Sequence, residues 1–155
     1  MKRRQLRKDE AKDLLGQAAL CLEGVAFDKK DNIEIVNESI IMVNGSPCFF
    51  LMEGRILPLL RMFLSREVRM KTVVVDMGAV RFVTSGADVM RPGIVSIGSG
   101  ISAGDPVLIT DEKHGKPLAV GLALLPTEEM KAMGKGKAVR VIHYVGDKLW
   151  AIGDR

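Results

Sequence analysis

The sequence predicts an α+β protein with a small N-terminal α/β domain at residues 1–71 and a C-terminal barrel of short strands at residues 72–155. Two observations carry this prediction. The first part contains an apolar repeat with helical spacing and a run of strands, whereas the second alternates β-branched segments with turns about every ten residues. Six short strands in one small domain favour a closed or half-closed barrel. With 155 residues, 47% of them hydrophobic, the chain is long enough to fill one large or two small domains with a packed core.

The first predicted element is an amphipathic helix over residues 8–23, with Gly24 as its stop. Six apolar residues recur at the spacing of one helical face: Ala11, Leu14, Leu15, Ala18, Ala19 and Leu22. Residues 1–12 hold six basic and two acidic residues, while the rest of the chain balances. This surplus predicts either a long-range attraction for phosphate or a solvated helix end. Removal of residues 2–8 is expected to leave the fold intact.

A three-stranded meander follows, with strands at 33–36, 40–43 and 49–52. The dipeptide Asn44-Gly45 supports it, because Asn-Gly is a strong hairpin signal. Residues 55–64 are apolar on nearly every side, which predicts a buried helix with Pro58 in its first turn. The N-terminal domain is therefore expected to contain a helix, a three-stranded meander and a second helix.

The barrel is predicted to begin with a strand at 72–76 and a short helix at 80–85. A second short helix is expected between Thr127, as its N-cap, and Gly134, with acidic residues in its first turn. Five further segments have the character of short strands: residues 95–97, 107–110, 119–125, 138–143 and 148–152.

Several classes of protein are not expected from this composition. No stretch approaches about 18 uninterrupted apolar residues and the basic start lacks an apolar run, so we expect a cytoplasmic protein without a membrane span. Cys21 and Cys48 lack CxxC spacing, which predicts buried thiols and neither a zinc site nor a disulfide. His114 and His143 have no motif around them, and the glycine-rich run at 98–104 lacks the ending of a nucleotide-binding loop. No catalytic residue, metal or cofactor is therefore predicted.

Residues 73–94, VVVDMGAVRFVTSGADVMRPGI, are the most informative segment of the chain. Small residues at both ends of the short helix leave its backbone N–H groups open to a phosphate, and Arg81 and Arg91 supply charge. The Met90-Arg91-Pro92-Gly93 sequence predicts a type II turn. The side chain of Arg91 is expected to project from that turn.

Other side chains are interpreted more conservatively. Asp76 and Asp88 bracket the short helix and are expected to accept hydrogen bonds from the backbone rather than to catalyse. Phe82 is interpreted as a core residue. Lys148 and Trp150 are expected to share one face of the last strand, because side chains alternate along a strand, and this points to a partly exposed Trp150.

The short-helix segment closely resembles the opening of the PUA domain, the RNA-binding module named after pseudouridine synthases and archaeosine transglycosylases. The resemblance runs in order and without gaps over Asp76, Gly78, Ala79, Val83, Gly86, Ala87, Asp88, Val89, Pro92, Gly93 and Ile94. The flanking segments VNGSPCFFLMEGRILPLLRMFL, at 43–64, and GKGKAVRVIHYVGDKLW, at 134–150, are similar to the malignant T-cell amplified sequence family of translation factors.

The resemblance implies a PUA pseudobarrel with two short helices at 72–155 after a pre-PUA domain at 1–71. It also implies a noncatalytic protein that binds structured RNA, either tRNA or small-subunit rRNA, in translation initiation or ribosome recycling. The small ribosomal subunit and a protein with an initiation-factor-like domain are the implied partners. The residues expected to contact RNA are Gly78, Ala79, Arg81, Ser85, Gly86, Ala87, Arg91, Pro92, Gly93, Lys148 and Trp150.

Two other functions stay open at this point. The chain is alternatively an RNA-guiding accessory subunit of an RNA-modifying enzyme, because PUA domains are commonly attached to such catalysts. Residues 1–71 are too few for a synthase active site, so any catalysis would come from another chain. A protein-interaction module without an RNA role is the third reading, which the balanced charge of residues 13–155 permits.

Overall fold

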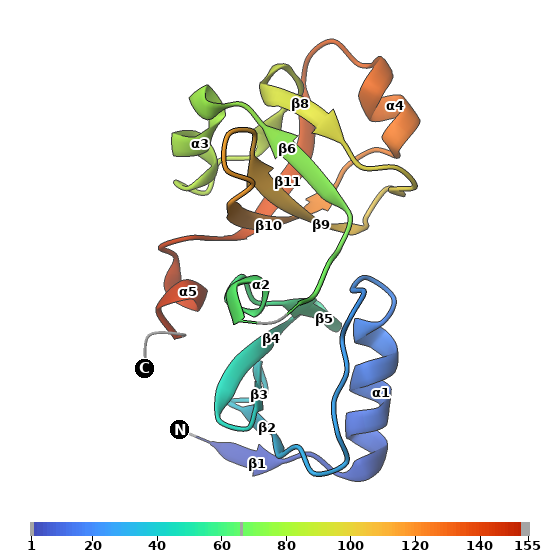
Figure 1. Cartoon of the computed structure of the whole chain (residues 1–155), viewed down its shortest axis with the longest axis vertical. Coiled ribbons are helices and arrows are strands. Elements are labelled where there is room, and N and C mark those ends of the chain that lie inside the picture. Colours follow the sequence, from blue (N-terminus) through green and yellow to red (C-terminus); the bar gives the residue numbers. More distant parts are fainter. Residues whose placement is uncertain (1, 66, 153–155) are drawn as a thin grey trace. The chain divides into compact units, whose positions relative to one another are not determined.

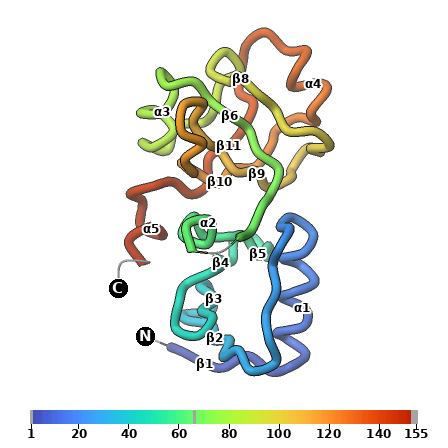
Figure 2. Tube along the Cα trace, viewed as in Figure 1, coloured from blue at the N-terminus to red at the C-terminus, as the bar shows by residue number. Residues whose placement is uncertain are grey.

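The computed structural model describes residues 2–65 and 67–152, and it divides into two compact units (Figures 1 and 2). The N-terminal unit ends at Arg69 and also takes in Ile152, and the C-terminal unit covers Met70–Ala151. Each unit contains one β-sheet. Among the described residues, no helix combines the length and the apolar character needed to cross a bilayer.

The N-terminal unit is built on a five-stranded antiparallel sheet in the order β1-β2-β3-β4-β5. Helix α1 packs against β5 and buries Leu14 and Ala18. Phe27, in the loop before β2, meets Phe49 of β4 edge-to-face, with ring centroids 6.0 Å apart. The elements are β1 (Arg3–Gln5), α1 (Lys8–Ala18), β2 (Ile33–Val36), β3 (Ile40–Val43), β4 (Ser46–Met52), β5 (Arg55–Pro58) and α2 (Met62–Ser65).

Tight turns with left-handed backbone join these strands. Asn44 and Gly45 have φ values of 51° and 82°, as a type I′ turn requires, and this confirms the predicted Asn-Gly hairpin. Glu53 and Gly54 have φ values of 51° and 74°, so the chain reverses at once and β5 pairs with β4. With β1 added at the opposite edge, the sheet has five strands where the sequence predicts three.

The prediction of a helix at residues 55–64 is therefore wrong. Arg55 to Pro58 pair with Met52 to Phe49 as β5, and helical structure is confined to α2. Leu57 and Leu60 are fully buried. A short apolar run does not by itself distinguish a buried strand from a buried helix, and here the Glu53-Gly54 turn decides between them.

Helix α1 ends at Ala18, earlier than the predicted end at residue 23. Glu23 instead pairs with Arg69 as an isolated antiparallel bridge. Gly24 has a φ of 84°, and a Cβ on it would lie 2.5 Å from the carbonyl oxygen of Glu67. Glycine is therefore required at position 24 because the chain passes close to Glu67 beside this bridge, and not because the residue ends a helix.

The C-terminal unit is a six-stranded sheet in the order β7-β11-β10-β9-β6-β8, which curls into a nearly closed pseudobarrel. The edge strands β7 and β8 are joined directly by the short 3₁₀ helix η1, and the one parallel pair in this sheet is β6 with β9. Buried residues such as Val73, Val75, Ile109 and Val139 fill the interior. The elements are β6 (Thr72–Val75), α3 (Met77–Val83), β7 (Val89–Met90), η1 (Arg91–Gly93), β8 (Ile94–Ile97), β9 (Pro106–Asp111), β10 (Pro117–Ala123), α4 (Thr127–Ala132), β11 (Lys137–Tyr144) and α5 (Lys148–Ile152).

Residues 148–152, predicted as a strand, form the helix α5. The carboxylate of Asp147 accepts a hydrogen bond from the N–H of Trp150 at 2.8 Å, which is the arrangement of a helix N-cap. Lys148 and Trp150 are therefore two positions apart on a helix and do not share a face.

The second predicted helix is present as α4, but Thr127 is not its N-cap, since Pro126 takes that position. The buried hydroxyl of Thr127 donates to the carbonyl of Gly98 at 2.8 Å and accepts from the N–H of Ile101 at 2.9 Å. It therefore anchors the glycine-rich connection at 98–104, which links β8 to β9 as the sequence predicts.

The basic start of the chain is built into the sheet. Arg4 lies in β1, and its guanidinium is 2.8 Å from Glu38 and 3.1 Å from Glu10. Arg3 and Arg7 also form ion pairs, with Glu34 at 3.7 Å and with Asp9 at 3.3 Å. The structure argues against the expectation that removal of residues 2–8 leaves the fold intact, because that removal would delete β1 and the partner of two carboxylates.

Substitution of Arg4 by Met tests this arrangement, because it keeps an apolar stem and removes the guanidinium. The hydrogen bonds from Arg4 lower the pKa of both Glu10 and Glu38. A lowered folded-state pKa stabilises the fold above the unfolded pKa, and the effect disappears as the pH falls through the folded value. We expect Arg4→Met to melt below the wild type near pH 7 and the two melting temperatures to converge below about pH 4. A difference that is constant with pH in thermal melts followed by circular dichroism would contradict this account.

Candidate nucleic-acid interface

Helix α3 follows β6 directly and is closed at both ends by hydrogen bonds. The carboxylate of Asp76 accepts from the N–H of Ala79 at 2.9 Å and caps the N-terminus. At the other end, Gly86 has a φ of 89°, its N–H donates to the carbonyl of Val83, and the N–H of Ala87 donates to that of Phe82. This is a Schellman motif. The helix starts earlier than the predicted 80–85, and its N-terminus is already occupied by a carboxylate.

Close approach of α3 to η1 forms the next part of the site. The N–H of Asp76 donates to the carbonyl of Gly93 at 2.9 Å. A Cβ on Gly93 would lie 3.1 Å from the Cβ of Ala79, so both positions require small residues. The predicted type II turn is wrong, because residues 91–93 form a 3₁₀ helix with Pro92 in its first turn and Gly93 does not have a positive φ.

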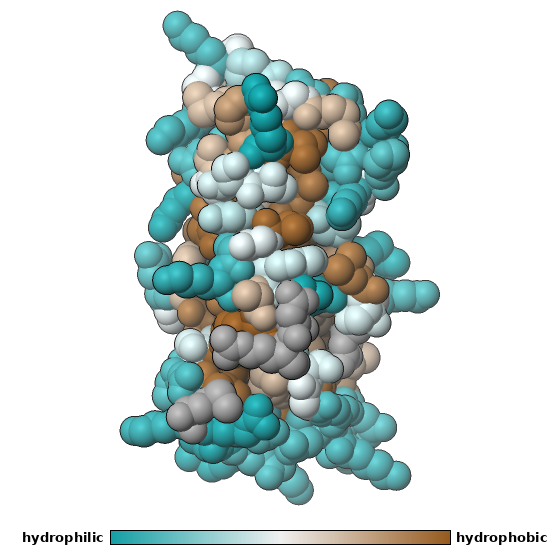
Figure 3. Space-filling view, turned by 90° about the vertical axis from the view of Figure 1, so that its left-hand side faces the viewer, coloured by the Kyte–Doolittle hydropathy of each residue, from teal (hydrophilic) through white to brown (hydrophobic). Residues whose placement is uncertain are grey.

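A groove of about 620 Å³ runs along α3, β7 and η1. Its surface is mainly apolar, and Phe82 and Met90 are unusually exposed for their types, at 54% and 46%. Figure 3 shows apolar and polar side chains interleaved on the face of the C-terminal unit that carries α3. Lys137 lies beside the groove, with its ammonium 3.5 Å from the carboxylate of Asp88. The lining residues are Asp76, Gly78, Ala79, Phe82, Val83, Ala87, Asp88, Val89, Met90, Pro92, Gly93 and Lys137.

Several residues predicted from the sequence meet in this groove, and others do not. Those that line it are Gly78, Ala79, Ala87, Pro92 and Gly93. Arg81 is exposed on α3, and its guanidinium carbon lies 4.8 Å from the ring centroid of Phe82. The exposed Ser85 donates its hydroxyl to the carbonyl of Arg81 at 2.7 Å. Gly86 lies beneath Tyr144 and has a structural requirement of its own, since a Cβ there would meet the ring at 2.8 Å.

Arg91 does not project freely, contrary to the prediction. Its Nε donates to the carbonyl of Met130 at 2.8 Å, and its Nη1 donates to that of Ile94 at 3.2 Å. It lines a separate hollow of about 270 Å³ with Lys131 and β8, and not the groove. Arg91 therefore connects α4 to the start of β8. A charge reversal here would disturb the fold as well as any ligand contact.

Lys148 and Trp150 lie on α5 and do not line the groove. Lys148 is exposed and Trp150 is partly exposed. The partial exposure of Trp150 was predicted, but for a strand and not for a helix.

Seven residues that line the groove were not among the predicted RNA contacts: Asp76, Phe82, Val83, Asp88, Val89, Met90 and Lys137. The prediction that Phe82 is a core residue is wrong, because Val83 takes the buried position on α3. The spacing of apolar residues on so short a helix did not separate the two. Lys137 lies opposite Met90 in the β7–β11 ladder, a long-range pairing that no local pattern indicates.

The remaining polar residues have structural partners. Asp88 accepts from the N–H of Val141 at 3.1 Å, so Asp76 and Asp88 both hold backbone, as predicted. His143 is buried with its Nδ1 2.9 Å from Asp147, and burial lowers its pKa. His114 is exposed in a turn, as expected. Cys48 is buried, whereas Cys21 is only partly buried and its thiol lies 3.7 Å from the carbonyl oxygen of Ala18.

Comparison with known proteins assigns the family. Residues 71–145 match the PUA domain family. The chain is 40% identical over 154 residues to an uncharacterized protein of Methanocaldococcus jannaschii, covering 96% of this chain and 95% of that protein. It is 35% identical over 132 residues to translation machinery-associated protein 20 of Saccharomyces cerevisiae, and the match covers 79% of this chain and 73% of that protein. Malignant T-cell-amplified sequence 1 of Rattus norvegicus is 35% identical over 130 residues, and the match covers 79% of this chain and 71% of that protein. The chain belongs to this family of PUA-domain proteins.

Solved structures agree with this assignment. A hypothetical protein of Pyrococcus horikoshii superimposes with a TM-score of 0.87 at 36% identity, over 98% of this chain and 99% of that chain. A chain of the archaeal box H/ACA sRNP Nop10–Cbf5 complex is similar over 63% of this chain and 30% of its own length, with a TM-score of 0.50 at 33% identity. The matches therefore place the chain among PUA-domain proteins whose relatives include translation machinery-associated protein 20 and malignant T-cell-amplified sequence 1.

Substitution of Gly86 by Ala tests how α3 is held in this PUA domain. The substitution has two costs. Alanine disfavours the positive φ at this position, and its Cβ would lie 2.8 Å from the ring of Tyr144. Gly100 is the matched control, because its φ is 70° and no atom lies within 4 Å of a Cβ placed there. We expect Gly100→Ala to lower the free energy of unfolding by about 1 kcal/mol and Gly86→Ala by at least about 2 kcal/mol. Equal losses in urea denaturation would show that contact with Tyr144 contributes nothing.

Proposed function

We propose that this protein is a noncatalytic RNA-binding protein that docks structured RNA, either tRNA or small-subunit rRNA, in the groove along α3. The observation that carries the proposal is an exposed aromatic ring, Phe82, on a mainly apolar groove with basic side chains beside it, within a PUA domain. Such a surface suits an unstacked base and its phosphates, since bases stack on aromatic rings and Lys or Arg meet the backbone. Translation is the proposed setting, which the name of translation machinery-associated protein 20 supports, and the finer proposal is initiation or ribosome recycling in the cytoplasm.

In this proposal the residues divide by role. Gly78, Ala79, Ala87, Pro92 and Gly93 shape the groove, Phe82 and Met90 contact a base, and Arg81, Ser85 and Lys137 face the backbone. Gly86 and Arg91 hold these elements in place. Lys148 and Trp150 are proposed contacts outside the groove. Phosphate is not expected at the N-terminus of α3, because the Asp76 carboxylate already takes an N–H there.

The alternative function is an RNA-guiding accessory subunit of an RNA-modifying enzyme. The similarity to a chain of a box H/ACA particle supports it, although that similarity covers less of both chains than the translation-associated relatives do. Purification of the tagged protein from its own cells distinguishes the two. Small ribosomal subunits, with or without an initiation-factor-like protein, are expected under the first proposal, and a catalytic subunit under the alternative.

Binding to RNA is expected to weaken steeply with salt and to leave the RNA chemically unchanged. Each neutralised phosphate contributes roughly −0.7 to −0.9 to the slope of log K against log salt, so about five contacts give a slope near −4. Filter binding of a tRNA transcript and of small-subunit RNA across a salt series measures it, and mass spectrometry of the recovered RNA checks for modification. No affinity for either RNA at low salt would remove the proposal.

Substitution of Phe82 by Ala is expected to weaken RNA binding with little change in stability, because the ring is 54% exposed. Loss of one stacked base costs about 1–3 kcal/mol, which is a loss of roughly five- to 150-fold in affinity. Leu124→Ala is the control, since Leu124 is 42% exposed and does not line the groove. RNA affinity that falls equally in both variants, or in neither, would take Phe82 out of the binding site.

A further inference from the structure

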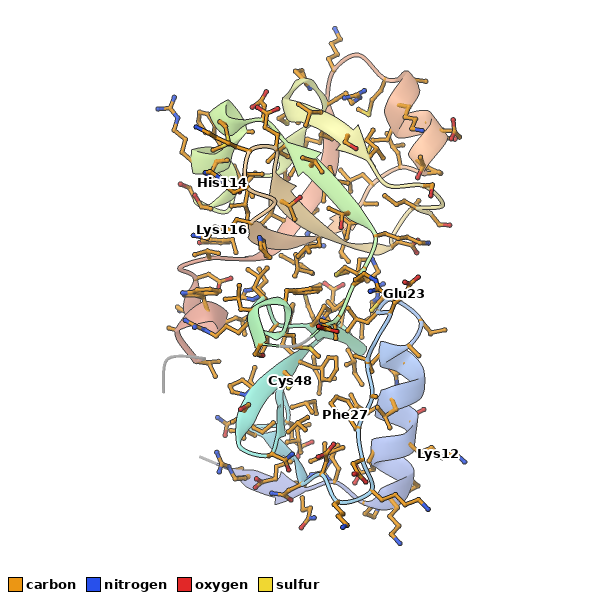
Figure 4. The ribbon with its side chains drawn as sticks, in the orientation of Figure 1. Lys12, Glu23, Phe27, Cys48, His114 and Lys116 are labelled. Carbon is orange, nitrogen blue, oxygen red and sulfur yellow. The ribbon has the colours of Figure 1, made fainter. Side chains whose placement is uncertain are left out.

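The β9–β10 hairpin tip, residues 112–116, lies beside the start of α3. Strands β6 and β9 are parallel neighbours, with Val75 in register with Asp111, so both end at the same end of the barrel. The N–H of Glu112 donates to the carbonyl of Val75 at 2.9 Å, and the carboxylate of Glu112 accepts from the N–H of Met77 at 3.4 Å. Figure 4 shows His114 and Lys116 on the side of the C-terminal unit that carries α3.

A buried carboxylate holds this hairpin tip in one conformation. Asp111 is only 4% exposed, and it accepts backbone N–H donors from Lys113 at 2.9 Å, from Lys116 at 3.1 Å and from His114. The N–H of His114, followed by those of Lys116 and Lys113, holds the pKa of Asp111 below its usual range. The Asp111 carboxylate therefore takes the backbone N–H groups of the tip, and the side chains of Lys113, His114 and Lys116 remain exposed at the surface.

Three of the five residues of the tip have basic side chains. Lys113, His114 and Lys116 are all exposed. Within residues 2–65 and 67–152, neither lysine lies within 4.0 Å of a carboxylate oxygen, while the one acidic residue of the tip, Glu112, is turned toward α3. Arg81 lies four residues after Met77, so it is on the stripe of α3 that begins beside the tip.

We infer that the hairpin tip is a second RNA contact, which takes the phosphodiester backbone of the strand whose base occupies the groove. This inference rests on the proposed function. The tip contains two lysines, one glutamate, one histidine and one glycine, so it offers charged and polar groups and no aliphatic side chain. A protein partner would be expected to find apolar or aromatic contacts, whereas RNA phosphates need only cations at a fixed spacing. Met77 and Arg81 make the surface continuous from the tip to the groove.

The test is the double charge reversal Lys113→Glu with Lys116→Glu, which leaves Asp111 and its turn intact. Lys29→Glu with Lys30→Glu is the matched control, because these adjacent exposed lysines make the same change of charge in the N-terminal unit. Binding of a tRNA transcript is measured across a salt series, with thermal melts of each variant. We expect the hairpin variant to lose at least about tenfold in affinity at low salt and to have a slope shallower by about 1.4–1.8, corresponding to two lost phosphate contacts. The control is expected to stay within about twofold of the wild type.

The outcomes separate this inference from the proposed function. Wild-type protein that fails to bind RNA removes both. Wild-type binding together with an unaffected hairpin variant, or with equal losses in hairpin and control variants, overturns the second contact and leaves the groove in place. Loss of affinity with an unchanged salt slope also overturns it, because phosphate contacts must release counterions.

Discussion

The parallel pairing of β6 with β9 is the constraint on which the C-terminal unit depends. It places Val73 and Val75 in the core beside Ile109, so β6 is fully embedded between β9 and β8. Parallel neighbours end at the same end of a sheet. As a result, the start of α3 and the β9–β10 hairpin emerge together, although they are distant in the sequence. This pairing therefore places the β9–β10 hairpin beside the helix that lines the candidate interface.

Small residues then determine how closely the surrounding elements approach. Gly93 meets Ala79 where η1 passes α3, and Gly86 lies beneath Tyr144 where α3 ends. Larger side chains at these positions would push α3 outward and open the groove. Because the backbone of α3 is held on both sides, Phe82 is left on the outer surface. Exposure of an aromatic ring on a fixed element gives a base a rigid surface for stacking, which reduces the entropy lost on binding.

Local patterns predicted the elements whose cause is itself local. Asn44-Gly45 forms a type I′ turn because two adjacent residues tolerate positive φ, and the apolar spacing of α1 places Leu14 and Ala18 inside. The same patterns failed where a neighbour decided. Residues 55–58 form a strand because they pair with the edge of β4, and Arg91 is held in the structure because α4 presents the carbonyl of Met130.

The sequence by itself determined a barrel of short strands, because turn chemistry and periodicity act over a few residues, and its resemblance to the opening of the PUA domain indicated the barrel type and the small residues around α3. Tertiary structure alone decided which side chains share the groove. Lys137 joins Met90 through a ladder between distant strands, and Glu112 reaches Met77 through a parallel pairing. Phe82 faces outward because Val83 occupies the core position. These relations depend on the packing of elements far apart in the chain, which no short segment encodes.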